Sequence, residues 1–233
     1  MADKTVLIVG SSDGIGLALA RRLLAQNYRV IGISRSQSSV NHPQFLQLRM
    51  DVTSDEYGES LGQLLVREGP FAGVVYCAAI AGRSDIDTLG LDLRVFDVNL
   101  MGAVKTAECV LSHFTSNGKG RFIVLSSQAD GIVNAQASSY TASKAAVTQY
   151  FEGLGLRLRH GTVAISVVRF GFVATKLARS GWQPCRISPD VAAGYLQNLL
   201  EKPKPELRAT YPKRIAPLVF FVRHLQRLRV FWL

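Results

Sequence analysis

The sequence has little of what marks membrane spans, disulfide frameworks or metal centres. No stretch reaches the roughly 18 uninterrupted apolar residues that a transmembrane helix needs. The three cysteines form no Cys-x-x-Cys pair and the four histidines form no helical pair, so we expect reduced, mostly buried thiols and no metal. The apolar run Val6–Val9 is too short for a signal peptide, and the simplest expected location is cytoplasmic.

Acidic residues are also scarce, with 17 Asp and Glu against 27 Lys and Arg in 233 residues. The excess is concentrated at one end, because residues 201–233 hold +6 of the net charge of +10. A nucleic-acid-binding domain would need basic residues spread over its folded surface, and the first 200 residues are nearly balanced. We therefore expect no nucleic-acid partner.

Hydrophobic residues make up 48% of the chain, which is enough for a core and excludes a disordered chain. Strand-length apolar runs alternate with longer helix-like stretches through residues 1–200, the pattern of repeated βαβ units. This predicts an α/β fold of three layers, αβα, with a doubly wound parallel sheet in a single domain, which residues 201–233 complete as a strand and a basic apolar tail. Strands are expected at Thr5–Gly10, Arg29–Ser34, Phe45–Met50, Gly73–Ala78, Arg121–Ser126, Val163–Arg169 and Glu206–Tyr211, and a helix at Val191–Leu200 after Ser188-Pro189-Asp190.

A glycine-rich turn joins the first strand to the apolar helix Leu17–Leu24. It reads Gly10-Ser11-Ser12-Asp13-Gly14-Ile15-Gly16. A tight strand-to-helix turn needs a residue without a Cβ, and the approach of a pyrophosphate to backbone N–H groups needs another. The turn predicts a dinucleotide site, although a glycine cluster by itself can be a plain structural turn.

The end of the second strand, Ile33-Ser34-Arg35-Ser36, should meet the adenosine ribose. No acid stands there to bind a 2′-hydroxyl, whereas Arg35 offers a planar cation for a 2′-phosphate and Ser34 a hydroxyl donor. NADP(H) is therefore favoured, and NAD(H) stays open. Asp13 opposes this choice, because its carboxylate would repel a 2′-phosphate unless it points away, and Arg35 can also be an ordinary surface cation.

Tyr140 and Lys144 lie four residues apart, hence on one face of a helix. A free tyrosine titrates near 10, and a cation within about 4–6 Å favours the phenolate. Lys144 can therefore lower the pKa of Tyr140 and make it a competent acid and base. The same spacing is common on helix surfaces, where such a pair has no catalytic role.

Together with the glycine turn, this pair makes the sequence similar to the short-chain dehydrogenase/reductase family, in its single-domain, Rossmann-type branch. The resemblance implies a catalytic set of Asn99, Ser127, Tyr140 and Lys144, in which Ser127 ends a strand thirteen residues before Tyr140. It also implies a cofactor-binding set, which comprises Gly10, Ser12, Gly14, Ile15 and Gly16 in the turn, Ser34 and Arg35 after the second strand, Asp51 and Val52 at the adenine, Ala78 after the fourth strand, and Val173 and Thr175 at the nicotinamide.

Three segments differ from the family pattern. The Asn-Asn-Ala-Gly that usually follows the fourth strand is Tyr76-Cys77-Ala78-Ala79 here, which removes the amide side chains that brace the sheet and predicts weaker cofactor binding. The usual Pro-Gly after the sixth strand is Phe170-Gly171, which predicts a freer and bulkier nicotinamide-facing loop. The substrate lid, Lys176–Ile187 with Trp182, is short and predicts an open pocket.

The resemblance implies an NAD(P)-dependent oxidoreductase that transfers a hydride between nicotinamide and a ketone or secondary alcohol. Tyr140 would be the general acid and base, and Ser127 would hydrogen-bond the same substrate oxygen. Lys144 would hold the nicotinamide ribose and tune Tyr140, and Asn99 would keep a water chain and the local helix in place. The altered segments leave open a non-catalytic NADP-binding or scaffold protein, and the short chain disfavours an epimerase or dehydratase of the family's longer branch.

The tail from Ile215 combines large apolar side chains with arginines. If it is helical after Pro217, Arg223 and Arg227 lie off an apolar face made by Leu218, Phe221, Leu225 and Leu228. One interpretation is that this segment packs on the body or on a partner subunit, since homodimers and homotetramers are usual in the family that the sequence resembles. The other is peripheral contact with an anionic membrane surface, which would suit an apolar carbonyl substrate.

Overall fold

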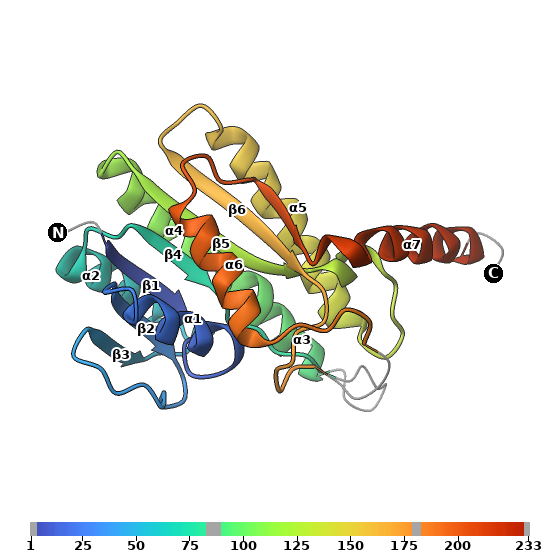
Figure 1. The fold of residues 1–233 in the computed structure, drawn as a ribbon, viewed down its shortest axis with the longest axis horizontal. Coiled ribbons are helices and arrows are strands. Elements are labelled where there is room, and N and C mark those ends of the chain that lie inside the picture. Colours follow the sequence, from blue (N-terminus) through green and yellow to red (C-terminus); the bar gives the residue numbers. More distant parts are fainter. Residues whose placement is uncertain (1–3, 83–89, 179–182, 231–233) are drawn as a thin grey trace.

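The predicted doubly wound α/β fold is confirmed by a computed structural model, which describes residues 4–82, 90–178 and 183–230. One sheet of seven strands has the order β3-β2-β1-β4-β5-β6-β7 (Figure 1). All neighbouring strands in it are parallel. The strands are β1 (Thr5–Val9), β2 (Arg29–Ser34), β3 (Phe45–Arg49), β4 (Gly73–Tyr76), β5 (Gly120–Ser127), β6 (Val163–Phe170) and β7 (Arg208–Tyr211).

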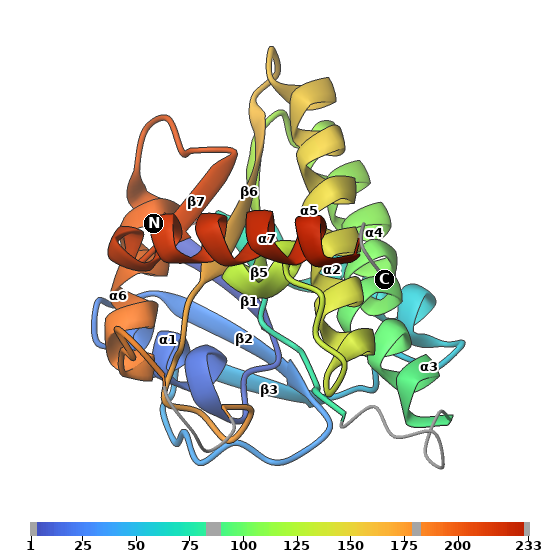
Figure 2. The same cartoon turned by 90° about the vertical axis from the view of Figure 1, so that its right-hand side faces the viewer.

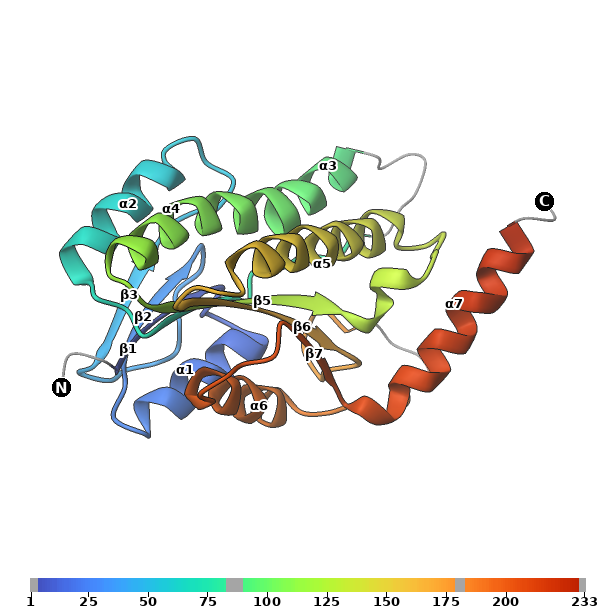
Figure 3. The same ribbon diagram turned by 90° about the horizontal axis from the view of Figure 1, so that it is seen from above.

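Helices cover both faces of this sheet, which explains why its strands are apolar on both sides (Figure 3). One face carries α1 (Gly14–Leu24) and α6 (Pro189–Glu201), and the other carries α2 (Tyr57–Glu68), α4 (Gly102–Ser116) and α5 (Ser138–Leu158). The remaining helical elements are α3 (Gly90–Phe96), the π-helical turn η3 (Asp97–Met101), the 3-10 turns η4 (Gln128–Gly131) and η5 (Lys213–Ile215), and α7 (Ala216–Val230).

The predicted strands are all present, with ends that differ by no more than two residues. Helix α6 begins as predicted, because the Ser188 hydroxyl accepts a hydrogen bond from the Val191 N–H at 3.2 Å. Helix α1 begins earlier than Leu17, because the Asp13 carboxylate caps Gly14 N at 2.7 Å. Strand β7 adds the seventh strand from residues beyond 200, while the division of the chain at that residue stays an interpretation.

All three cysteine thiols are free. Cys77 and Cys109 are half-buried, but Cys185 is exposed, so the prediction of mostly buried thiols is wrong for Cys185. Within the described residues, no helix is both long and apolar enough to cross a membrane. The predicted cytoplasmic location stays a prediction.

Helix α7 leaves the sheet edge after β7 and projects beyond the three layers (Figures 1 and 3). In Figure 2 it crosses in front of the sheet. It is fixed to the loop before α5, because the Gln226 side chain accepts from Val133 N and donates to Val133 O, both at 3.0 Å. A hollow of about 700 Å³ lies between α5, η4 and α7. Its charged walls are largely paired, since Arg169 contacts Asp130 at 2.6 Å and Arg208 pairs with Glu152.

The sequence predicts that the sheet loses the amide side chains that brace it after β4, but a tyrosine supplies a brace there instead. Tyr76 is fully buried, and its hydroxyl donates to the Val98 carbonyl at 2.6 Å. This bond ties the end of β4 to η3, the turn that carries Asn99. The tyrosine therefore supplies a brace where the family pattern has an amide.

Tyr76→Phe is expected to lower the free energy of unfolding by about 1–3 kcal/mol, because it leaves the buried Val98 carbonyl without its donor. Urea unfolding followed by circular dichroism measures the change. Tyr150→Phe, on the exposed side of α5, is the matched control and should change stability by less than about 0.5 kcal/mol. An equal free energy of unfolding for Tyr76→Phe and the wild type would show that this hydrogen bond does not stabilise the fold.

Candidate active site

The glycine turn lies where the chain order of the sheet reverses, between β1 and β4. Gly10 has a φ of +91°, and a Cβ there would lie 2.6 Å from the Ala78 nitrogen. A Cβ at Gly16 would lie 2.0 Å from the Gly10 oxygen. The turn therefore needs these glycines, and it directs the N-terminus of α1 toward the carboxyl ends of the strands, where an anionic group is favoured.

Two adjoining cavities of about 300 and 380 Å³ form one cleft above these strand ends, and Cys77 and Ala79 line both. The walls of the two cavities include most of the predicted site residues. Gly10, Ser12, Ser34, Arg35, Asp51, Val52 and Ala78 line the smaller cavity, and Ile15, Ser127, Tyr140, Lys144, Val173 and Thr175 line the larger one. Gly14 and Gly16 belong to the glycine turn, and neither lines the wall of these two cavities. An elongated cleft with a glycine turn and a basic end fits a dinucleotide.

At the basic end, the loop after β2 is held by Gln47 of β3. The Gln47 amide donates to the Ser34 hydroxyl at 2.9 Å and to the Ser36 carbonyl at 2.8 Å, and its oxygen accepts from Ser38 N at 2.7 Å. Sequence reasoning missed this positioning residue. The signal was a single amide in the otherwise apolar first four residues of β3.

The Asp13 carboxylate, which opposed a 2′-phosphate in the sequence analysis, has both oxygens occupied. One oxygen accepts from Gly14 N at 2.7 Å, and the other lies 2.8 Å from Lys176 Nζ. The hydrogen bond from Lys176, followed by that from Gly14, holds the pKa of Asp13 below its ordinary value. Its negative charge is therefore countered locally, and Arg35 stays exposed at the other side of the cavity.

Asp51 lies at the same cavity with one oxygen fixed. That oxygen accepts from the Thr53 backbone N–H at 3.0 Å and from the Thr53 hydroxyl at 2.8 Å. Burial raises the pKa of Asp51, but the two Thr53 hydrogen bonds and the charge of Arg35 outweigh it, so the net pKa is lowered. Within the described residues, the second carboxylate oxygen accepts no hydrogen bond.

In the larger cavity, the structure brings Ser127, Tyr140 and Lys144 together. The Ser127 hydroxyl accepts from Ala129 N at 3.1 Å and lines the same cavity as Tyr140. Lys144 is buried, its Nζ donates to the Leu125 carbonyl at 2.8 Å, and it lies 5.9 Å from the centre of the Tyr140 ring. The three side chains thus converge from the end of β5 and the first two turns of α5.

The titration of this group differs from the prediction. Burial raises the pKa of Tyr140 and outweighs the hydrogen bond with Ser127, so the predicted lowering by Lys144 is wrong for this arrangement. Burial also lowers the pKa of Lys144 to about 8. Lys144 does not lower the pKa of Tyr140 because its ammonium is directed at the Leu125 carbonyl rather than at the phenol oxygen.

Asn99 lies behind these residues in η3 and is fully buried. Its amide oxygen accepts from Ile80 N at 2.8 Å, while its amide nitrogen donates to Ile80 O at 2.9 Å and to the Ser143 hydroxyl at 3.0 Å. The side chain therefore joins the loop after β4 to the helix that carries Tyr140 and Lys144. This geometry makes Asn99 a positioning residue.

The segment after β6 also departs from expectation. Phe170 is buried, and its ring packs against Tyr195 and Tyr211, so the predicted extra bulk lies in the core rather than in the loop. Backbone bonds between Phe172 and Ile187 and between Ala174 and Ile187, each 2.9 Å long, hold the two ends of the predicted lid together. Trp182 lies outside the described residues.

The substrate side of the larger cavity is mainly apolar and was not predicted. Phe172, Ile215 of η5 and Val219 of α7 contribute to its wall. Gln128 is also buried there; its amide nitrogen donates to Pro212 O at 3.2 Å, and its oxygen has no hydrogen-bond partner in the described part of the chain. This wall suits a substrate that is mostly apolar, with one polar group that can hydrogen-bond the Gln128 amide oxygen.

Known proteins are similar to this chain in both sequence and fold. Residues 4–185 match the short chain dehydrogenase family. An uncharacterized oxidoreductase of Schizosaccharomyces pombe is 29% identical over 96% of this chain and 79% of its own length. The chloroplastic NADPH-dependent aldehyde reductase 2 of Arabidopsis thaliana is 29% identical over 78% of this chain and 76% of its own length.

Among solved structures, a short chain dehydrogenase from Burkholderia cenocepacia in complex with NADP has a TM-score of 0.84 at 20% identity, with 97% of each chain covered. This likeness shows a common fold. The family match spans most of the sequence and contains the whole glycine turn and the convergent Ser127, Tyr140 and Lys144. The chain therefore belongs to the short-chain dehydrogenase/reductase family of NAD(P)-dependent oxidoreductases.

Proposed function

We propose that the protein is an NADPH-dependent carbonyl reductase or alcohol dehydrogenase, which transfers a hydride between nicotinamide and a ketone or secondary alcohol. The observation that carries this proposal is the convergence of Ser127, Tyr140 and the buried Lys144 in one cavity, which adjoins the dinucleotide cleft. The bound nicotinamide would supply or accept the hydride. The protein's own residues have to handle the proton and the charge on oxygen.

In the reduction direction, Tyr140 donates its phenolic proton to the substrate oxygen as negative charge develops there. Ser127 donates a hydrogen bond to the same oxygen, and its position is fixed by the Ala129 N–H. Lys144, held by its hydrogen bond to the Leu125 carbonyl, would offer a donor to a ribose hydroxyl of the cofactor. Asn99 keeps the helix carrying Tyr140 and Lys144 in register with the loop after β4.

The choice of NADPH rests on the smaller cavity. Arg35 is exposed at its wall with no acid at the end of β2, and the Asp13 charge is countered by Lys176. The relative from Arabidopsis thaliana is named as NADPH-dependent. The alternative, a non-catalytic NADP-binding or scaffold protein, draws on the altered segments at Tyr76–Ala79 and Phe170. Against it, the Tyr76 hydroxyl braces the end of β4 and the Phe170 ring packs on Tyr195 and Tyr211.

Tyr140→Phe should lower kcat/KM for ketone reduction by about 10²–10⁴-fold, because it removes the proton donor but keeps the ring. NADPH affinity, measured by the change in cofactor fluorescence, should stay as in the wild type. Tyr150→Phe is the matched control, since its ring lies on the same helix away from the cavity. Saturable NADPH binding by the wild type with no turnover of any ketone or aldehyde would support the non-catalytic alternative instead.

Arg35→Ser should weaken NADPH binding by roughly 10- to 100-fold, the loss of one charge-assisted hydrogen bond, and leave NADH binding unchanged. Titration with both cofactors side by side measures the two affinities. Arg157→Ser, at an exposed position near the end of α5, controls for the change in net charge. Equal weakening for NADPH and NADH would contradict the assignment of Arg35 to the 2′-phosphate.

The pKa of Lys144 predicts a pH-dependent stability. Burial lowers it from 10.5 to about 8, so between these pH values the unfolded chain binds a proton that the folded chain does not. The free energy of unfolding should therefore rise with pH across this window, relative to Lys144→Met, by roughly 1.4 kcal/mol per pH unit. Urea unfolding at several pH values measures the difference, with Lys213→Met as the exposed control. A difference that stays flat would place the charged amine in a well-solvated site.

A further inference from the structure

The outer side of α7 is apolar and exposed. The exposed fractions are 72% for Phe220, 60% for Phe221, 48% for Leu225 and 40% for Leu218. At 3.6 residues per turn these four side chains span about 160° of the helix circumference, and we call this face the α7 patch. Exposed apolar side chains gathered in this way mark an interaction surface rather than the scatter that is normal on protein surfaces.

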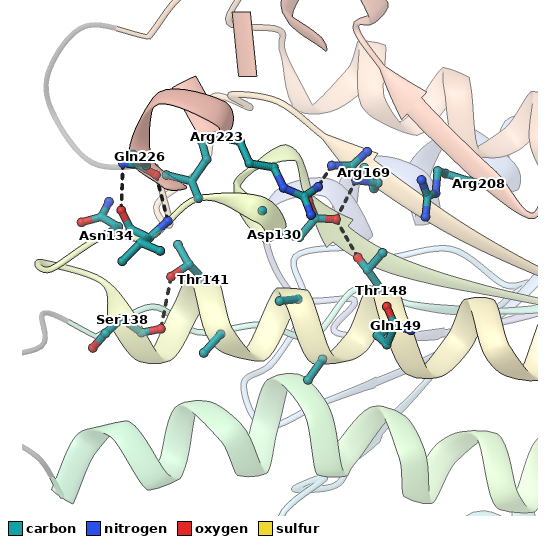
Figure 4. A pocket seen from close by; sticks show the side chains of 16 residues that line it. Asp130, Asn134, Ser138, Thr141, Thr148, Gln149, Arg169, Arg208, Arg223 and Gln226 are labelled. Carbon is teal, nitrogen blue, oxygen red and sulfur yellow. Dashed lines mark hydrogen bonds and ion pairs between the residues drawn. The ribbon is translucent and has the colours of Figure 1, made fainter. Parts of the chain in front are cut away.

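The opposite side of α7 is anchored to the body, so the α7 patch is directed away from it. Gln226 is bonded to the Val133 backbone, and Arg223 packs over Gly131, where an added Cβ would lie 2.8 Å from the Arg223 Cδ atom. Figure 4 shows Arg223 and Gln226 turned toward the loop that carries Asp130 and Asn134. The helix therefore has one side that contacts the body and another that carries the α7 patch together with the exposed His224.

The charge of residues 207–233 indicates what kind of partner binds the α7 patch. No acidic residue follows Glu206. Of the cations after it, Arg208 pairs with Glu152 and Arg223 packs over Gly131, whereas Lys213 and Arg214, just before α7, are exposed. The rest of the chain is also net positive, because the whole chain carries +10. A second copy of this protein is itself net positive, whereas an anionic lipid surface offers both negative charge and an apolar phase.

The position of α7 connects this surface with the active site. Val219 of α7 and Ile215, just before it, line the cavity that contains Tyr140. The same helical segment therefore forms part of the substrate wall on one side and carries the α7 patch on another. A lipid surface in contact with the patch would lie beside the apolar part of the cavity.

We propose that α7 docks the protein on an anionic lipid surface through Leu218, Phe220, Phe221 and Leu225. Resting on the proposed function, we further infer that the substrates include apolar ketones or secondary alcohols dissolved in that surface. The docking itself does not depend on catalysis, and the two parts are therefore tested separately.

Vesicle co-sedimentation tests the docking with the full chain. The wild type should sediment with vesicles of equal parts phosphatidylglycerol and phosphatidylcholine, and only weakly with pure phosphatidylcholine or at high salt. Phe220→Ser/Phe221→Ser should lower the partition coefficient by about tenfold or more, because it removes the two most exposed rings of the patch. Val66→Ser, at an exposed apolar position on α2, should bind as the wild type does, and so should Tyr140→Phe.

Three results would overturn the docking. The wild type would not sediment with phosphatidylglycerol vesicles, or Phe220→Ser/Phe221→Ser would bind them equally well. Alternatively, gel filtration without lipid would show an oligomer that Phe220→Ser/Phe221→Ser converts to a monomer, which would assign the α7 patch to self-association. Circular dichroism of each variant checks that the fold is retained.

Kinetics test the substrate class. Phe220→Ser/Phe221→Ser should raise the apparent KM for a long-chain ketone presented in phosphatidylglycerol vesicles by about tenfold, and leave the KM for a short water-soluble ketone unchanged. An equal effect on both ketones would overturn the inference on substrates. If the wild type reduces neither ketone, the proposed function fails, while the vesicle binding still decides the docking.

Discussion

The active-site cleft depends on how closely the backbone of Gly10 approaches Ala78. A Cβ at Gly10 would lie 2.6 Å from the Ala78 nitrogen, so the ends of β1 and β4 can meet only because the side chain is absent. This contact sets the floor of the cleft where its two cavities join, at Cys77 and Ala79. It also directs the first turn of α1 at the place where a pyrophosphate would lie.

Much of this architecture could be predicted from the sequence, because the determining signals are local. The strands are apolar on both faces, and the Ser188 cap and the glycine spacing are each read within a few residues. The braces could not be predicted in this way. The bond from Tyr76 to Val98 and those from Gln47 to the loop after β2 depend on which distant segments become neighbours.

The pKa values of the site residues could not be predicted either, because they also depend on contacts between distant segments. The spacing of Tyr140 and Lys144 was read correctly as bringing the two side chains together, but their pKa values depend on burial and on the direction of the ammonium. The role of Asn99 is also clearer in three dimensions. It lies in a π-helical turn, a local widening that often occurs at functional sites, and its amide joins two segments that the sequence separates.

The wall of the substrate cavity has a mixed origin. The proposed catalytic residues and Phe172 lie within 4–185, the part that matches the family, whereas Ile215 and Val219 lie beyond it. Part of the cavity wall is therefore encoded outside the stretch that carries Ser127, Tyr140 and Lys144. Exchanging the last thirty or so residues between relatives would change that part of the wall and leave these three side chains in place.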